Sequence, residues 1–157
     1  MRYLPLLATA SLAALTMLPL PAIAEEAHAL FRPDAMDWRA GPPTLPPGAE
    51  LAVLHGNPGA EGLFALRFKF PAGYHIPPHL HPKPEIITVI SGTIRLGHGE
   101  TADAATAETL EAGGLFAMPL EMAHYLWADE ETVVQLNSVG PFGISYIDPE
   151  DDPRKSN

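Results

Sequence analysis

The chain has 157 residues, of which 9 are basic and 19 acidic, so its formal net charge is −10 at pH 7 with neutral histidines. Such an acidic surface repels nucleic-acid phosphates and anionic lipid, and we expect neither nucleic acid nor membrane as a partner. The absence of cysteine excludes disulfides, thiolate metal sites and thiol nucleophiles. At this length, one domain can bury a sizeable core.

Residues 1–24 have the pattern of a signal peptide. Arg2 precedes an apolar run over residues 4–18, and residues 21–24 (Pro-Ala-Ile-Ala) end in the small residues that signal peptidase prefers. The run is shorter than the roughly 20 residues that span a bilayer, which favours cleavage over a membrane anchor. Cleavage after Ala24 would remove one basic side chain and leave 133 residues with a net charge of −11. We therefore expect a periplasmic or secreted protein.

Residues 25–50 are polar and rich in proline, which predicts an arm that lies across the domain and is anchored by Trp38. The segment 51–147 is predicted to be the folded domain. Its clearest strand covers residues 63–70, where bulky apolar side chains alternate with polar ones. The acidic tail, residues 148–157, is expected to be solvated and mobile.

Further strands are separated by glycine and proline. Residues 85–91 are apolar on both faces, which indicates either a second layer or a partner subunit, so a homodimer is considered. Residues 101–111 are expected to form a loop with one helical turn. The remaining predicted strands are 51–54, 92–97, 115–118, 122–127, 132–139 and 142–147. About eight to ten short strands without a long helix predict an all-β sandwich or barrel.

Two histidines point to a metal site. His79 and His81 fall on the same face of an extended chain, with their Cα atoms about 6.6 Å apart. Glu85 follows a turn imposed by Pro82 and Pro84 and can supply an oxygen ligand. His124 is the candidate fourth ligand, provided that the later strands fold back beside the first. Such a donor set suits Fe, Mn, Ni, Cu or Zn rather than calcium, and leaves one or two positions for water, oxygen or substrate.

The spacing of these residues resembles that of the cupin superfamily. The first cupin motif has Gly, five residues, His, one residue, His, three or four residues, Glu, six residues and Gly. Every position is met, by Gly73, His79, His81, Glu85 and Gly92. The second motif is partial.

In the second motif, Gly113, Pro119 and His124 fit. Glu121 replaces a turn glycine and Ala128 replaces an asparagine. The turn should favour a residue that tolerates a positive φ where Glu121 stands.

The resemblance covers about residues 51–147 and implies a cupin-type jelly-roll barrel of antiparallel strands. It also implies a divalent metal held by His79, His81, Glu85 and His124, often in a homodimer. His75 lies four residues before His79 and could face the pocket as a catalytic acid or base, or only cap the strand.

The sequence therefore predicts an exported metal-binding cupin, with a dioxygenase-like oxidoreductase acting on a small oxygen-rich organic substrate as the preferred function. A cupin isomerase, lyase or decarboxylase is one alternative. A non-catalytic module that binds a small ligand or metal is another.

Overall fold

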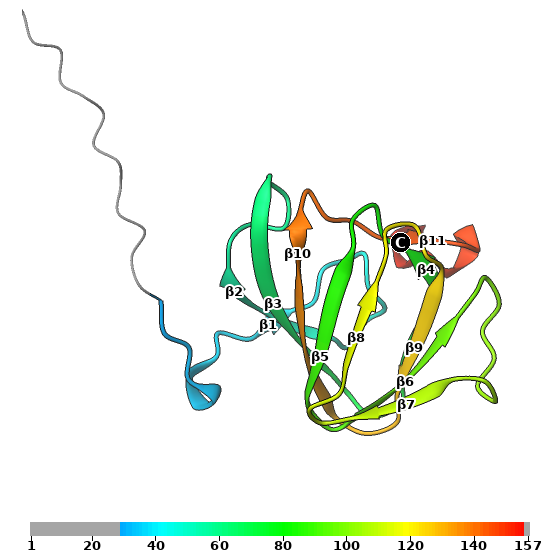
Figure 1. Ribbon diagram of the computed structural model, residues 1–157, viewed down its shortest axis with the longest axis horizontal. Coiled ribbons are helices and arrows are strands. Elements are labelled where there is room, and N and C mark those ends of the chain that lie inside the picture. Colours follow the sequence, from blue (N-terminus) through cyan, green and yellow to red (C-terminus); the bar gives the residue numbers. More distant parts are fainter. Residues whose placement is uncertain (1–28, 156–157) are drawn as a thin grey trace, which may run out of the picture. The chain divides into compact units, whose positions relative to one another are not determined.

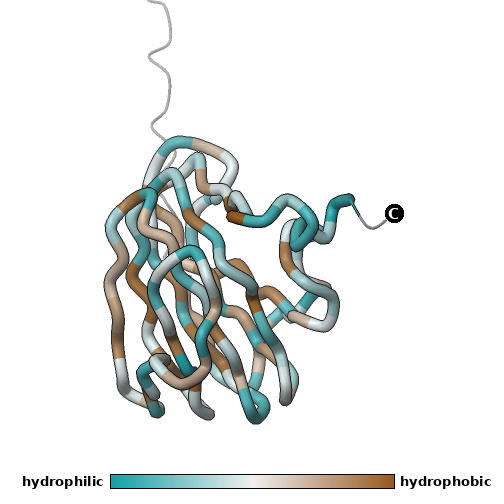
Figure 2. The backbone as a smooth tube through the Cα atoms, turned by 90° about the vertical axis from the view of Figure 1, so that its right-hand side faces the viewer, coloured by the Kyte–Doolittle hydropathy of each residue, from teal (hydrophilic) through white to brown (hydrophobic). Residues whose placement is uncertain are grey.

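A computed structural model describes residues 29–155, so the predicted signal peptide over residues 1–24 lies outside the described residues. Eleven strands form two antiparallel sheets that face each other (Figure 1). Hydrophobic and hydrophilic residues alternate along the strands (Figure 2), which gives each sheet one face for the core. This arrangement confirms the predicted all-β jelly roll.

The larger sheet has six strands in the order β1-β2-β3-β10-β5-β8. Their bounds are β1 Arg39–Ala40, β2 Glu50–His55, β3 Gly62–Phe70, β5 Glu85–Ser91, β8 Leu115–Met118 and β10 Thr132–Gly140. As the alternation in β3 predicts, Phe64, Leu66 and Phe70 are buried between the sheets. Strand β10 lies between β3 and β5 and pairs with both, so it joins the early and late parts of the chain.

The smaller sheet has five strands in the order β11-β4-β9-β6-β7. Their bounds are β4 Tyr74–Leu80, β6 Thr93–His98, β7 Glu108–Glu111, β9 His124–Ala128 and β11 Ser145–Tyr146. Strand β9 lies between β4 and β6, which brings the second cupin motif beside the first. No helix among residues 29–155 is long and apolar enough to cross a membrane.

Two local predictions need correction. The loop expected over residues 101–111 contains one hydrogen-bonded turn, where the N–H of Thr106 donates to the carbonyl oxygen of Asp103. It is shorter than expected, because residues 108–111 form β7, in which Leu110 pairs with Ile94 of β6 and packs against the core. The strand expected over 142–147 is reduced to β11. Residues 142–144 leave the sheet because their backbone and side chains contact the histidine cluster described below.

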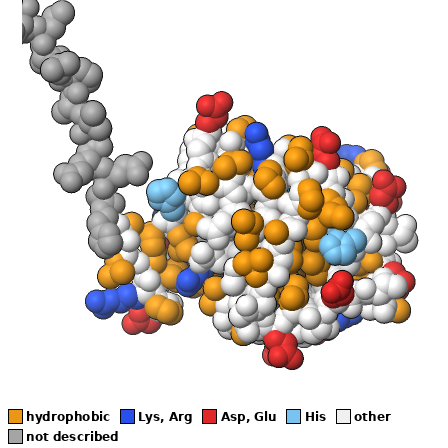
Figure 3. Space-filling view, viewed as in Figure 1, with side chains coloured by type: hydrophobic (Ala, Val, Ile, Leu, Met, Phe, Trp, Pro, Cys, Tyr) orange, Lys and Arg blue, Asp and Glu red, His pale blue; other side chains and the backbone are white. Residues whose placement is uncertain are grey.

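The outer face of the larger sheet carries exposed apolar side chains. Ile86 is 46% exposed, Ile90 41% and Leu115 56%. Hydrophobic side chains gather near the centre of the space-filling view (Figure 3), where Figure 1 places β5 and β8. Both faces of β5 are thus apolar, as the sequence indicates, and the homodimer stays a prediction.

The proline-rich arm is tied to the barrel by tyrosine hydroxyls. Tyr74 donates to the carbonyl oxygen of Pro46 at 2.6 Å, and Tyr146 donates to that of Thr44 at 2.8 Å. The half-buried Trp38 lies under the Lys69 ammonium, 4.8 Å from the ring centroid. The arm also contains the short 3₁₀ helix η1, Pro33–Ala35.

The C-terminal segment contains two more 3₁₀ helices, η2 over Pro149–Asp151 and η3 over Pro153–Lys155. Asp148 caps η2 by accepting a hydrogen bond from the backbone N–H of Glu150. The mobility expected of this tail stays a prediction.

Candidate metal centre

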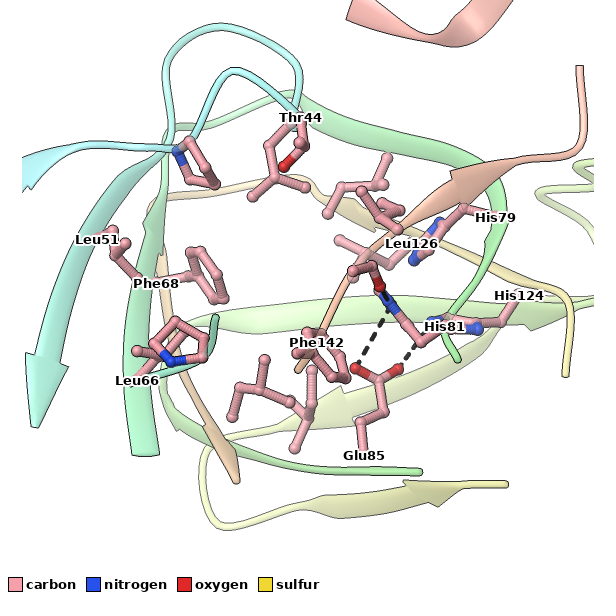
Figure 4. A pocket seen from close by; sticks show the side chains of 18 of the residues that line it. Thr44, Leu51, Leu66, Phe68, His79, His81, Glu85, His124, Leu126 and Phe142 are labelled. Carbon is pink, nitrogen blue, oxygen red and sulfur yellow. Dashed lines mark hydrogen bonds and ion pairs between the residues drawn. The ribbon is translucent and has the colours of Figure 1, made fainter. Parts of the chain in front are cut away.

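Strand pairing brings the four predicted ligands together. His79 near the end of β4 lies opposite His124 at the start of β9. Glu85 begins β5, and His81 lies in the connection that leads to it. All four side chains are buried although they are polar, and they point toward one another at one side of a cavity (Figure 4).

The ligand atoms converge closely. One ring nitrogen from each of His79, His81 and His124 lies within 4.8 Å of the other two. Oε1 of Glu85 lies 2.8 Å from Nε2 of His124, and its Oε2 lies 3.6 Å from Nε2 of His81. The three imidazoles therefore converge, and the Glu85 carboxylate lies beside two of them.

Backbone carbonyls determine which histidine nitrogens face that point. Nδ1 of His79 donates to the carbonyl oxygen of Pro77 at 2.7 Å, and Nδ1 of His81 to that of Gly143 at 2.6 Å. Nδ1 of His124 donates to the carbonyl of Met122 at 3.0 Å. A carbonyl only accepts, so each Nδ1 carries a proton, and in the neutral ring Nε2 then presents a lone pair, the tautomer that metal ligation requires.

Burial keeps two of the rings neutral. It lowers the pKa of His79 well below its usual value, with further lowering by His124 and His81. It also lowers the pKa of His81, although Glu85 and the carbonyl of Gly143 oppose the shift. Neutral imidazole is the form that binds metal ions.

The contact between Glu85 and His124 tests whether a cation fits. Oε1 of Glu85 is buried and has no well-directed hydrogen bond, although it lies close to Nε2 of His124. Two acceptors at this distance repel unless a proton or a metal ion lies between them. Burial disfavours a proton on His124, but the close Glu85 carboxylate outweighs burial and raises the pKa of His124, so this pair attracts positive charge. The residues thus fit a divalent metal.

A cavity of about 300 Å³ opens beside the four ligands. Figure 4 shows the polar cluster at one side and Leu51, Leu66 and Phe68 at the other. Thr44 and Leu45 of the arm also line the cavity. A small molecule in this space would touch the ligand cluster at one end and hydrocarbon at the other.

His75 is not among the residues that line this cavity. Its ring stacks on Trp127, with centroids 4.8 Å apart and planes within 6°. In β4, Ile76 pairs with Leu126 while His79 pairs with His124, so β4 has one extra residue in this interval. The resulting bulge reverses the alternation between His75 and His79, and the structure does not bring His75 to the other four. The Pro77-Pro78 pair was the sequence signal for this bulge.

Sequence reasoning missed the loop at 142–144. Phe142 stacks on the His81 ring with centroids 4.6 Å apart, and Gly143 supplies the carbonyl that orients it. The expectation of a continuous strand concealed both roles, and no local pattern in the sequence distinguishes them.

The turn before His124 has the positive φ expected of the second motif, although Glu121 stands where the motif has glycine. Glu121 has φ of +60°, the one positive φ of a non-glycine residue in the part of the chain that the structure describes. Its backbone N–H donates to the carbonyl oxygen of His81 at 2.8 Å. The turn therefore links the two motifs through their backbones.

Comparison with known proteins places the chain in a family. The sequence profile of the ChrR cupin-like domain matches residues 26–142. The chain belongs to this family of cupins. Germin-like protein 3-1 of Oryza sativa subsp. japonica is 36% identical to the cupin over 69 residues, which are 43% of this chain and 31% of the relative. The cupin thus spans about a third of the length of the germin-like relatives that it matches.

Two solved structures share the fold of this cupin. A proposed acetylacetone dioxygenase from Methylibium petroleiphilum PM1 aligns with a TM-score of 0.62 and 20% identity, over 83% of this chain and 88% of its own. The anti-sigma ChrR of Rhodobacter sphaeroides, in complex with SigE, aligns with a TM-score of 0.51 and 21% identity, over 68% of this chain and 51% of its own. At these identities the likeness shows the fold alone.

Proposed function

We propose that this cupin is a metal-dependent, dioxygenase-like oxidoreductase that acts on a small organic molecule. The observation that carries the proposal is the position of His79, His81, Glu85 and His124 at the wall of a cavity of about 300 Å³. A purely structural metal site is closed by protein on all sides, whereas this one has room for a substrate beside the ligands.

The chain's own residues would bind and position the reactants. The three Nε2 atoms and the Glu85 carboxylate would hold the ion, and the carbonyls of Pro77, Gly143 and Met122 keep the rings oriented. A bound divalent ion, whether Fe, Mn, Ni, Cu or Zn, would supply Lewis acidity, and a redox-active one could also transfer electrons. The apolar walls would exclude water from the bound substrate.

The cavity favours this chemistry over that of an isomerase, lyase or decarboxylase. Apart from the four ligands, Thr44 is the one polar side chain among the described residues that line it. A threonine hydroxyl is a poor acid or base near pH 7, whereas proton-transfer enzymes need a titratable group near the substrate. The likeness to the proposed acetylacetone dioxygenase is consistent with this preference.

A non-catalytic metal-binding module is the second candidate. It is favoured by the same lack of a free acid or base in the cavity, and ChrR, which shares the fold, is an anti-sigma protein rather than a named enzyme. In that case the metal would hold a small ligand, or serve as the signal itself, without turnover.

Metal analysis and oxygen uptake distinguish the two candidates. The purified protein should contain close to one metal ion per chain, and His81→Ala should retain little. Oxygen consumption with a panel of diketones and catechols, on protein loaded in turn with each of the five metals, should reveal turnover. A fully loaded protein that consumes no oxygen with any of them would exclude the oxidoreductase and favour the binding module.

We also propose that the protein is exported, on the basis of the residue pattern at 1–24. Expression in a bacterium with two membranes, followed by mass spectrometry of the periplasmic fraction, should show a chain that begins at Glu25. An intact N-terminus in the cytoplasm would contradict this proposal.

A further inference from the structure

The cavity beside the ligand cluster is divided sharply by polarity. Its polar side chains are the four ligands and Thr44, and its remaining side chains are aliphatic, aromatic or proline. Among the described residues that line it there is no lysine, arginine, asparagine or glutamine. A substrate with polar groups distant from the metal would therefore lose hydration there without gaining a partner.

The charge of the cluster restricts the head group. A histidine that binds an ion through Nε2 does so as neutral imidazole, and the carbonyl oxygen at each Nδ1 leaves Nε2 to face the ion. A divalent ion together with the Glu85 carboxylate then has a net charge of +1. A monoanionic ligand brings the buried site to zero, whereas a dianion leaves an uncompensated negative charge in an apolar cavity.

From these two observations we infer the substrate class. The site takes a weak acid that binds as a monoanion through two neighbouring oxygens, and whose remaining atoms are hydrocarbon. Enolised diketones and catechols belong to this class. Dicarboxylates and polyhydroxylated molecules do not, so the substrate is less rich in oxygen than the sequence suggested. This inference rests on the proposed metal site.

Binding to zinc-loaded protein tests the inference without turnover, since Zn²⁺ has no redox chemistry. Calorimetric titration would compare oxalate with acetylacetone and its homologues, in which the two methyl ends become ethyl and then propyl. The chelating head is the same throughout the series. Affinity should rise about fourfold for each added CH₂ that enters the apolar part, and stop rising when the ligand exceeds the space of the cavity.

A charge introduced at the apolar end provides a second measurement. Leu51 is half-buried and lines the cavity, so Leu51→Lys should place a cation opposite the ligand cluster. The ratio of oxalate to acetylacetone affinity should then increase by about tenfold or more. The control is Leu63→Lys, at a residue 72% exposed and outside this cavity, which should leave the ratio unchanged.

The outcomes separate this inference from the proposed function. Zinc content is measured first, and a protein that takes up no metal would overturn both. A zinc-loaded protein that binds oxalate as tightly as acetylacetone, or shows no gain along the homologous series, would overturn the substrate class and leave the metal centre intact. The series uses unaltered protein, so its result stands even if Leu51→Lys does not fold.

Discussion

Gly73 and Gly92, the outer glycines of the first motif, form a matched pair for testing how the barrel constrains this motif. Their φ angles are nearly equal, +79° and +75°. A Cβ added at Gly73 would meet nothing within 4 Å, whereas one added at Gly92 would lie 2.5 Å from Oγ1 of Thr132 and 2.6 Å from the carbonyl oxygen of Glu131. Alanine at the two positions therefore has the same backbone strain and different steric surroundings.

The expected losses of stability differ accordingly. A left-handed backbone costs an L-residue about 1–2 kcal/mol, and loss of freedom in the unfolded chain offsets about 0.4–1 kcal/mol of this. Gly73→Ala should therefore reduce the free energy of unfolding by about 1 kcal/mol. Gly92→Ala should lose about 1–3 kcal/mol more from overpacking. Thr132 cannot easily move aside, since its hydroxyl donates to carbonyl oxygens of the chain and accepts the N–H of Thr93.

Urea unfolding followed by circular dichroism, on metal-free protein, measures both changes without a contribution from ligand binding. The dependence of the free energy on urea should be unaltered in both variants. Equal losses at Gly73 and Gly92 would refute the steric part of the reasoning. A negligible loss at Gly73 would refute the part based on φ.

Three further predictions concern the turn, the metal and the arm. Glu121→Gly should stabilise the protein by about 0.5–1 kcal/mol in the same assay, because glycine adopts a positive φ without strain. The control Glu130→Gly, at an exposed residue without a positive φ, should destabilise it. A loss of stability in both variants would contradict the inference that Glu121 is strained. His81→Ala should abolish most of the increase in melting temperature that added metal produces, and an increase equal to that of the unaltered protein would count against His81 as a ligand. Tyr74→Phe should lower the free energy of unfolding by about 1 kcal/mol, because it removes the hydrogen bond to Pro46. It should also accelerate amide hydrogen exchange at Leu45, whose N–H is bonded within the arm. Unchanged exchange would show that this hydroxyl does not hold the arm.

Much of this protein follows from its sequence because the relevant patterns are local. Side-chain alternation is a property of the extended backbone, so the spacing in residues 63–70 predicted which side chains enter the core. The same property places His79 and His81 on one face, and the first motif then identifies Glu85. Local spacing thus predicted an all-β sandwich or barrel and three candidate ligands, and the resemblance to the cupin motifs added the jelly roll and supported His124 as the fourth ligand.

Other features depend on contacts between distant parts of the chain, which local spacing does not encode. The bulge at Pro77-Pro78 directs His75 away from the cavity; the two prolines signal a break in the ladder, but the pairing of β4 with β9 decides where the register shifts. The loop at 142–144 contacts His81 across 62 positions of sequence. The arm lines the cavity because two tyrosine hydroxyls hold its backbone. The sequence by itself thus determined the fold and the candidate ligands, whereas the tertiary structure decided which residues surround them, because those neighbours are set by long-range packing.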